Sequence, residues 1–248
     1  MAQQNLNTQE TANDMLSQST AFINKNKKKL IICTVAVLVV IGAVFGFLYG
    51  YKKPHENKGQ AYISKANEYA MQGLQAKMSG QDSLVTVYYT KALNGDGQFP
   101  GLIAVAGYKF TNVSNVAKAM TGFCYYNMGK IKEAIEYLED FSPAGDESLS
   151  PAALATLANC YASDNRVDDA VKTLKKAAEE ADNFAVSPVY LLQAGELLES
   201  QKKNDEALEV YQQIKKDYPE SELCIPGQSP DGTPATPEIE RYITRVSK

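Results

Sequence analysis

The sequence predicts an all-α protein, an array of helical hairpins behind one N-terminal transmembrane helix. Two observations carry this prediction. Residues 30–49 form an apolar run of twenty residues without a charge, and a pattern of small and large side chains recurs later in the chain at spacings of 36 and then 37 residues. The chain has 248 residues, of which 44% are apolar, so it can bury a substantial core.

Residues 1–29 are expected to form a flexible cytoplasmic tail. They are rich in Asn, Gln, Ser and Thr and have few large apolar side chains, so they cannot build a core. Four lysines against two acidic residues give this tail a charge of +2, and since the whole chain carries −4, the remainder carries −6. A mildly acidic body argues against nucleic acid as a partner, because phosphate binding needs a basic face.

The run at 30–49 is predicted to be a transmembrane helix, since twenty helical residues rise about 30 Å and match a bilayer core. A buried core helix would be amphipathic, and a cleaved signal would have a shorter apolar region followed by small residues. Here the bulky FGFLYGYKK follows, which favours a retained anchor. Lysines crowd the N-terminal side more than the C-terminal side, so the N-terminus is expected in the cytoplasm. Residues 50–60 are expected to form a linker.

Three blocks in the body of the chain align with one another: 122–141, 158–177 and 195–214. Each block opens with a small residue, has a large residue three positions later, alanine twelve positions after the start, and a large residue four beyond that. The positions are Gly122, Tyr125, Ala134 and Leu138; Ala158, Tyr161, Ala170 and Leu174; and Gly195, Leu198, Ala207 and Tyr211.

This pattern predicts a helical hairpin in each block. Gly129, Asn165 and Lys202 mark the expected turns, because Gly and Asn tolerate the left-handed backbone that ends a helix. An acidic residue beside the start of each second helix suits the positive end of its dipole. Small residues let the paired helices approach closely, and large ones fill the space between hairpins.

A fourth, weaker copy is expected upstream. Gly73, Gly80 and Tyr89 fit the same frame, but Ala76 and Val85 stand where the large and small landmarks would be. The link at 94–115 contains the apolar stretch LIAVAGY, which either packs onto its neighbours or serves as a docking element; the sequence leaves both open.

The repeated pattern, with Pro219 of DYPES ending the last hairpin, resembles the tetratricopeptide repeat, whose period is about 34 residues. On this basis residues 61–221 are expected to form tetratricopeptide repeats and 222–236 a loop. Residues 237–248 are expected to form a helix that caps the stack, because their apolar side chains fall on one stripe.

The sequence gives no sign of catalysis. It lacks Walker, G-x-S-x-G and H-E-x-x-H motifs, and its single histidine, His55, follows the membrane run. The four cysteines form no C-x-x-C pair, so a zinc site is not expected, and Cys124 and Cys160 occupy a repeat position that suits a compact buried side chain. We therefore expect a protein that is not an enzyme and takes no cofactor, metal or small-molecule substrate.

The resemblance to tetratricopeptide repeats implies a partner-binding groove lined by the first helix of each hairpin. The residues it places there are Phe123, Tyr126, Asn127, Asn159, Ser163, Glu196 and Glu199. Aromatic side chains at one end and acidic ones at the other would suit an extended protein segment that is basic or aromatic.

The whole arrangement resembles the YfgM-type ancillary subunits of the bacterial Sec translocon, to which the segments FPGL, GYKFTN, DYPES and IERYI are similar. The resemblance implies a single-pass protein of the bacterial inner membrane, with a periplasmic body that docks secretory, translocon or chaperone proteins. The alternative is a structural assembly factor or spacer for an envelope complex.

Overall fold

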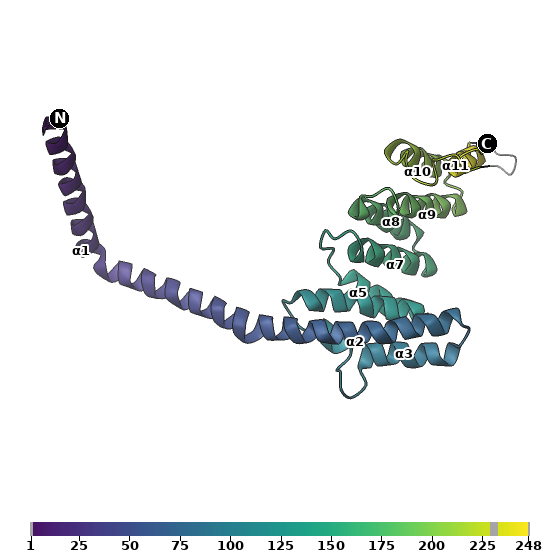
Figure 1. The fold of residues 1–248 in the computed structure, drawn as a ribbon, viewed down its shortest axis with the longest axis horizontal. Coiled ribbons are helices and arrows are strands. Elements are labelled where there is room, and N and C mark those ends of the chain that lie inside the picture. Colours follow the sequence, from purple (N-terminus) through teal and green to yellow (C-terminus); the bar gives the residue numbers. More distant parts are fainter. Residues whose placement is uncertain (1, 229–232, 248) are drawn as a thin grey trace. The chain divides into compact units, whose positions relative to one another are not determined.

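A computed structural model describes residues 2–228 and 233–247, with the side chains of 2–15 and 18 left out of the description. The regular secondary structure of these residues is entirely helical (Figure 1), apart from one β-bridge between Gln228 and Pro234. The chain divides into two compact units, Met1–His55 and Glu56–Lys248. The prediction of an all-α hairpin array is confirmed.

The first unit contains α1 (Ala2–Phe47) and the π-helical turn η1 (Leu48–Lys52), after which α2 (Lys53–Met78) begins. Residues 2–29 of the expected flexible tail and residues 50–60 of the expected linker are thus helical in the structure. No Gly or Pro occurs between residues 2 and 41, so nothing in the sequence breaks α1 there. The π turn lies just before Pro54, which has no N–H to make the regular helical bond to the carbonyl of Gly50 four residues earlier.

The apolar run has no protein packed against it. Every side chain from Leu30 to Tyr49 is exposed, and none of the most apolar window is buried. It lies in the one helix, among the described residues, that is long and apolar enough to cross a membrane. A buried core helix is therefore not what the structure contains at this position.

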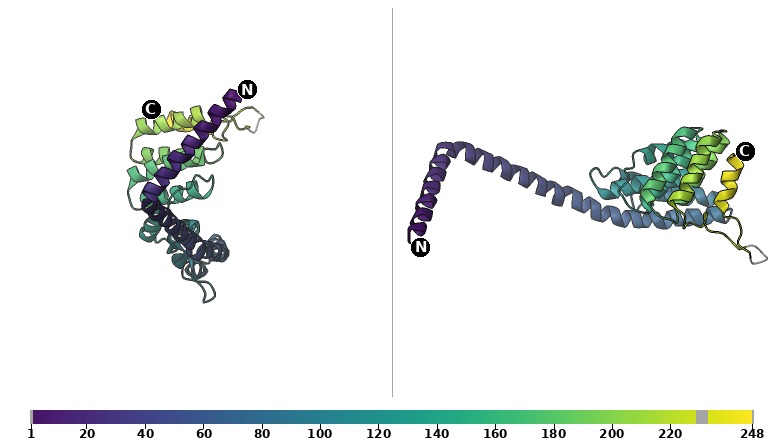
Figure 2. Two further views of the ribbon diagram at one scale, coloured as in Figure 1. Left: turned by 90° about the vertical axis from the view of Figure 1, so that its left-hand side faces the viewer. Right: turned by 90° about the horizontal axis from the view of Figure 1, so that it is seen from above.

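The second unit is a stack of helical hairpins, which successive colours follow in Figures 1 and 2. The hairpins pair α2 with α3, α5 with α6, α7 with α8, and α9 with α10, and α4 and α11 are additional helices. The bounds are α3 (Asp82–Asn94), α4 (Leu102–Ala106), α5 (Asn112–Asn127), α6 (Ile131–Glu139), α7 (Leu149–Ser163), α8 (Val167–Ala181), α9 (Ser187–Ser200), α10 (Asn204–Asp217) and α11 (Glu238–Val246).

The opening glycines allow the two helices of a hairpin to approach closely. A Cβ added to Gly122 would lie 2.7 Å from Cδ2 of Leu138, and one added to Gly195 would lie 2.7 Å from Cζ of Tyr211. Both partners stand sixteen residues after the glycine and are buried. The small and large landmark residues predicted from the sequence are therefore in contact where the two helices of these hairpins meet.

The fourth copy has the same contact. A Cβ on Gly73 would lie 3.0 Å from Cζ of Tyr89, again sixteen residues later, and the Tyr89 ring is buried. The hairpin of α2 and α3 thus repeats the geometry of the others despite its weaker sequence pattern.

The turns between paired helices also share one geometry. The turn that follows each first helix contains a residue with a positive φ: 68° at Gly80, 74° at Gly129, 62° at Asn165 and 61° at Lys202. In each turn two backbone bonds close the helix end, as where Gly129 N–H donates to Tyr126 O (3.0 Å) and the next N–H donates to the carbonyl five residues back. This is the Schellman arrangement, which satisfies carbonyls that the helix end leaves unpaired.

The link at 94–115 packs within its own unit. Phe99, Leu102 and Val105 are buried in the core shared by α2, α3 and α5. Asp96 fixes the loop, since Tyr69 Oη donates to its Oδ2 (2.5 Å) and the backbone of Phe99 donates to its Oδ1 (3.1 Å). Of the two readings left open by the sequence, packing accounts for the apolar side chains of LIAVAGY.

Candidate functional site

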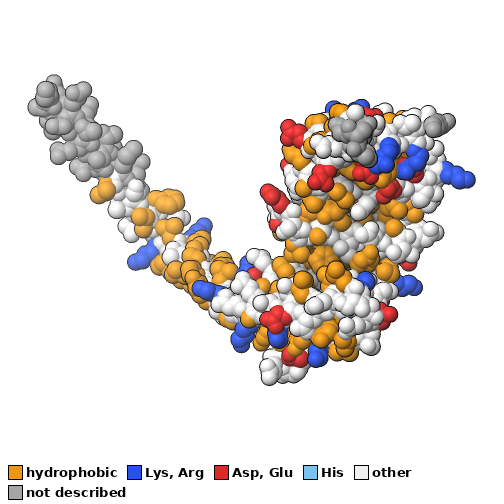
Figure 3. All heavy atoms as spheres, turned by 45° about the vertical axis from the view of Figure 1, so that its right-hand side comes forward, with side chains coloured by type: hydrophobic (Ala, Val, Ile, Leu, Met, Phe, Trp, Pro, Cys, Tyr) orange, Lys and Arg blue, Asp and Glu red, His pale blue; other side chains and the backbone are white. Residues whose placement is uncertain are grey.

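An apolar groove lies between α2 and α5, on the first helices of two successive hairpins. Its volume is about 300 Å³. The lining comprises Asn67, Ala70, Met71, Leu74, Tyr89, Val116, Met120, Phe123, Cys124, Asn127 and Leu149. Figure 3 shows hydrophobic side chains gathered in the middle of the second unit. Because no charged residue lines this groove, it suits an apolar side chain of a partner.

Large apolar side chains of α2 that line the groove are exposed to solvent. Met71 is 57% exposed and Leu74 is 40% exposed, although both border a buried core. Methionines at positions 71 and 120 give the walls flexible, polarisable side chains that can adapt to different partners. Contiguous exposed apolar surface of this kind often marks a site of protein–protein interaction.

Two of the residues predicted to bind a partner line this groove, Phe123 and Asn127. Asn127 is held in place, because its Nδ2 donates to Phe123 O (2.9 Å) and its Oδ1 accepts from Lys77 Nζ (3.1 Å). Tyr126, on the same turn of α5, is half-buried and does not line the groove.

The predicted residues of α7 lie on a separate part of the array. Asn159 is half-buried and Ser163 is exposed, and the Ser163 hydroxyl donates to the Asn159 carbonyl (2.8 Å). Neither residue borders the apolar groove.

The predicted residues of α9 face the last helix. Glu199 accepts hydrogen bonds from Arg245 Nε (2.8 Å), Arg245 Nη2 (2.7 Å) and Tyr211 Oη (2.6 Å). Burial opposes ionisation of Glu199, but these bonds outweigh it, so its pKa is lowered. Burial, followed by the neighbouring Glu196, raises the pKa of Tyr242 on α11. Glu199 therefore serves the attachment of α11, whereas Glu196 is exposed.

Sequence reasoning missed Met71, Leu74 and Met120. The signal was present for Leu74, because it follows Gly73 as Phe123 follows Gly122 in the repeat frame. Groove positions were assigned only to the three clear repeats, so the wall supplied by α2 was overlooked.

The cysteines of the array are packing residues. Cys124, at the floor of the groove, and Cys160 are buried, and burial raises their pKa values to about 12 and about 11. A thiol with such a pKa is protonated and unreactive at neutral pH. Among the described residues no three His, Cys, Asp or Glu side chains are grouped as a metal site would require.

Comparison with known proteins agrees with this geometry. The sequence profile of the tetratricopeptide repeat matches residues 120–142 and 190–221, which include α6 and α10. No curated protein matches the sequence.

Two crystal structures share the fold, both of a Podosopora anserina protein whose description reads "putative kinesin light chain nearly identical TPR-like repeats". One matches with 13% identity and a TM-score of 0.53, covering 74% of this chain and 86% of its own. The other, a form in which one glutamine is replaced by methionine, matches with 12% identity and a TM-score of 0.54, covering 75% and 86%. At these identities the likeness concerns the fold alone. These findings support tetratricopeptide repeats at the matched residues and a TPR-like fold for the helical array of the second unit.

Proposed function

We propose that this protein is a membrane-anchored protein–protein interaction module whose repeat array docks an apolar segment of a partner in the groove between α2 and α5. The observation that carries the proposal is the groove itself, open, uncharged and about 300 Å³ in volume. Arrays of this fold are typically non-catalytic interaction scaffolds.

The apolar helix supplies the anchor in this proposal. Its side chains from Leu30 to Tyr49 are exposed, which would be costly in water and is favourable in lipid. The lysines at 25–29 favour a cytoplasmic N-terminus, which puts the repeats on the periplasmic side of a bacterial inner membrane. Anchoring would concentrate the groove near membrane-bound partners, so weak contacts would suffice.

The partners we propose are secretory or envelope proteins. This part rests on the resemblance to YfgM-type translocon subunits, and it extends to work alongside chaperones at the translocon. Apolar segments are what a protein crossing a membrane exposes before it folds, and the uncharged groove matches that chemistry.

Photo-crosslinking in whole cells tests the groove. Replacing Met71 by p-benzoylphenylalanine puts the probe at the open wall, and the same replacement of Val87, exposed on α3 and outside the groove, is the matched control. We expect envelope proteins to be trapped from position 71 and not from position 87. Equal capture from both positions, or capture of cytosolic proteins alone, would sink the proposal.

Extraction and proteolysis test the anchor. The protein should stay in the membrane pellet at alkaline pH, and protease added to spheroplasts should digest residues 56–248. Release of the protein by alkali would refute the anchor. Digestion of residues 56–248 only after the spheroplasts are lysed would refute the orientation.

The second candidate is a rigid spacer in an envelope complex. It is favoured by polar contacts between the parts of the array, in which Tyr161 Oη donates to Glu139 (2.8 Å) and Lys203 pairs with Asp168 (2.6 Å). Changing Phe123 to Ala separates the two functions, because a receptor would lose its partner whereas a spacer would keep its complex intact.

A further inference from the structure

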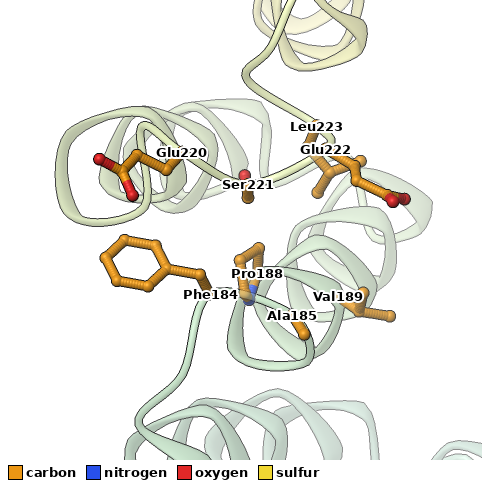
Figure 4. Close-up of a pocket in the computed structure, with 8 residues that line it drawn as sticks. All are labelled: Phe184, Ala185, Pro188, Val189, Glu220, Ser221, Glu222 and Leu223. Atoms are coloured by element: carbon orange, nitrogen blue, oxygen red, sulfur yellow. The ribbon is translucent and has the colours of Figure 1, made fainter.

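A second pocket lies at the rim of the array, between the loop that precedes α9 and the loop that follows α10 (Figure 4). It has a volume of about 400 Å³ and is lined by Phe184, Ala185, Pro188, Val189, Glu220, Ser221, Glu222 and Leu223. We call it the rim pocket. It shares no residue with the groove between α2 and α5.

The apolar side of the rim pocket is open to solvent. Phe184 is 52% exposed and Val189 is 41% exposed, and Pro188 is buried below them. The Phe184 ring rests edge-on against Tyr218, with 5.9 Å between the ring centroids. A protein does not gain stability by holding two large apolar side chains in water, so this surface is suited to a partner's apolar side chain.

The loop before α9 is fixed before any ligand arrives. Asn183 Oδ1 accepts from the backbone N–H groups of Ala185 (3.0 Å) and Val186 (2.9 Å). The buried Ser187 hydroxyl accepts from Asn183 N–H (3.0 Å) and donates to Ala178 O (2.8 Å). These bonds hold Phe184 in place, so binding would cost little loop entropy.

The opposite side of the rim pocket is acidic. Glu220 and Glu222 point to opposite ends of it in Figure 4, and neither has an ion-pair partner in the part of the chain that the structure describes. No basic residue lines the pocket. Between the two glutamates stands Ser221, which is 3% exposed and whose hydroxyl has no hydrogen-bond partner among the described residues.

We propose that the rim pocket binds a protein segment in which one apolar or aromatic side chain stands between two basic ones. The apolar side chain would pack on Phe184, Pro188 and Val189. The basic side chains would pair with Glu220 at one end and Glu222 at the other. Charge complementarity selects this occupant, because an acidic or neutral segment would leave both carboxylates without partners.

The absence of Trp from the chain allows a direct binding test. The probe is the peptide Gly-Ser-Arg-Trp-Arg-Ser-Gly, titrated with the purified full chain in zwitterionic detergent, with protein-free micelles as the blank. Its Trp emission should shift to shorter wavelength, with a dissociation constant between about 10 μM and about 1 mM. The probe Gly-Ser-Glu-Trp-Glu-Ser-Gly should give no shift.

Substitutions locate the site. The double change Glu220→Gln and Glu222→Gln should weaken binding by about threefold to thirtyfold and remove most of its salt dependence. Phe184→Ala should weaken it by about tenfold. The matched control changes two exposed glutamates elsewhere, Glu179→Gln and Glu209→Gln, and should leave the affinity unchanged.

Hydrogen exchange gives an independent readout. The Arg-Trp-Arg peptide should slow amide exchange in residues 183–189 and 219–225 and leave α2 and α5 as they were. The proposal is overturned if no shift is seen up to about 1 mM, if the double Glu→Gln variant binds as tightly, or if protection appears in the groove instead. A dimer of the chain that Phe184→Ala dissociates would assign the rim pocket to a second copy and overturn it as well.

Discussion

The contact between Gly195 and Tyr211 offers a quantitative test of how the hairpins close. In Gly195→Ala the new Cβ would lie 2.7 Å from Cζ and 2.9 Å from Cδ1 of the Tyr211 ring. Real Cβ contacts are not this short, so the ring or the helix has to move. The ring has little room, because Tyr211 is 0% exposed and its hydroxyl donates to Glu199 at 2.6 Å.

The expected cost follows from three contributions. Overpacking a filled core costs about 1–3 kcal/mol, and a displaced ring would lose about 1 kcal/mol of hydrogen bonding to Glu199. The better helix propensity of alanine returns about 1 kcal/mol. We therefore expect Gly195→Ala to lower the free energy of unfolding by about 1–3 kcal/mol.

Urea unfolding of the full chain, followed by circular dichroism in the far ultraviolet, measures this change. The hairpin of α7 and α8 shows how the clash can be relieved, since it carries Ala158 opposite Leu174, both fully buried. Adding Tyr211→Leu to Gly195→Ala should therefore recover part of the loss, with a coupling of about 1 kcal/mol or more between the two changes. The reverse control, Ala158→Gly, should cost about 1 kcal/mol through helix propensity. An unchanged or raised stability of Gly195→Ala would refute the reasoning.

Three further outcomes are expected. Lys202→Gly should raise the unfolding free energy by about 0.5–1 kcal/mol in the same urea assay, since Lys202 has a φ of 61° that glycine adopts without strain; a loss of stability would contradict this. Glu199 has a lowered pKa in the folded chain, so the stability it contributes is present above its unfolded pKa and is lost as the pH falls through its folded pKa. The difference in unfolding free energy between the native chain and Arg245→Gln, about 1 kcal/mol at neutral pH, should therefore shrink as the pH falls through this range, and a difference independent of pH would count against the pair. Cys124 and Cys160, with pKa values raised to about 12 and about 11 by burial, should resist Ellman's reagent at mildly alkaline pH in the folded chain and react in urea; rapid reaction in the folded chain would show that the core opens.

The hairpins could be predicted because their determinants are local and repeated. Gly129 and Asn165 mark turns that the structure closes with a positive φ, and the landmark sixteen residues after each opening glycine is the side chain that packs on it. A pattern that recurs three times at nearly constant spacing leaves few alternatives. The weaker first copy could also be predicted, although Ala76 and Val85 replace two of its landmarks, and its contact between Gly73 and Tyr89 is preserved in the structure.

The sequence carries two opposing signals for the tail. Polar composition favours disorder only where helix propensity is also poor, and residues 2–41 contain neither Gly nor Pro. Local side-chain bonds accompany the helix, as where Thr20 Oγ1 donates to Leu16 O (2.9 Å). Composition and propensity pointed in opposite directions, and the prediction of a flexible tail followed composition.

The sequence by itself determined the apolar helix, the hairpin period and the turns, because each depends on residues within a few turns of one another. Only the tertiary structure decided which face of the array stays open. Glu199 was a groove candidate from the sequence, but Arg245, 46 residues later, engages its carboxylate. Met71 belongs to the weaker repeat, for which the sequence assigned no groove residues, yet it lines the groove together with Phe123. Open surface depends on what distant segments cover, and the spacing of residues within one repeat does not contain that information.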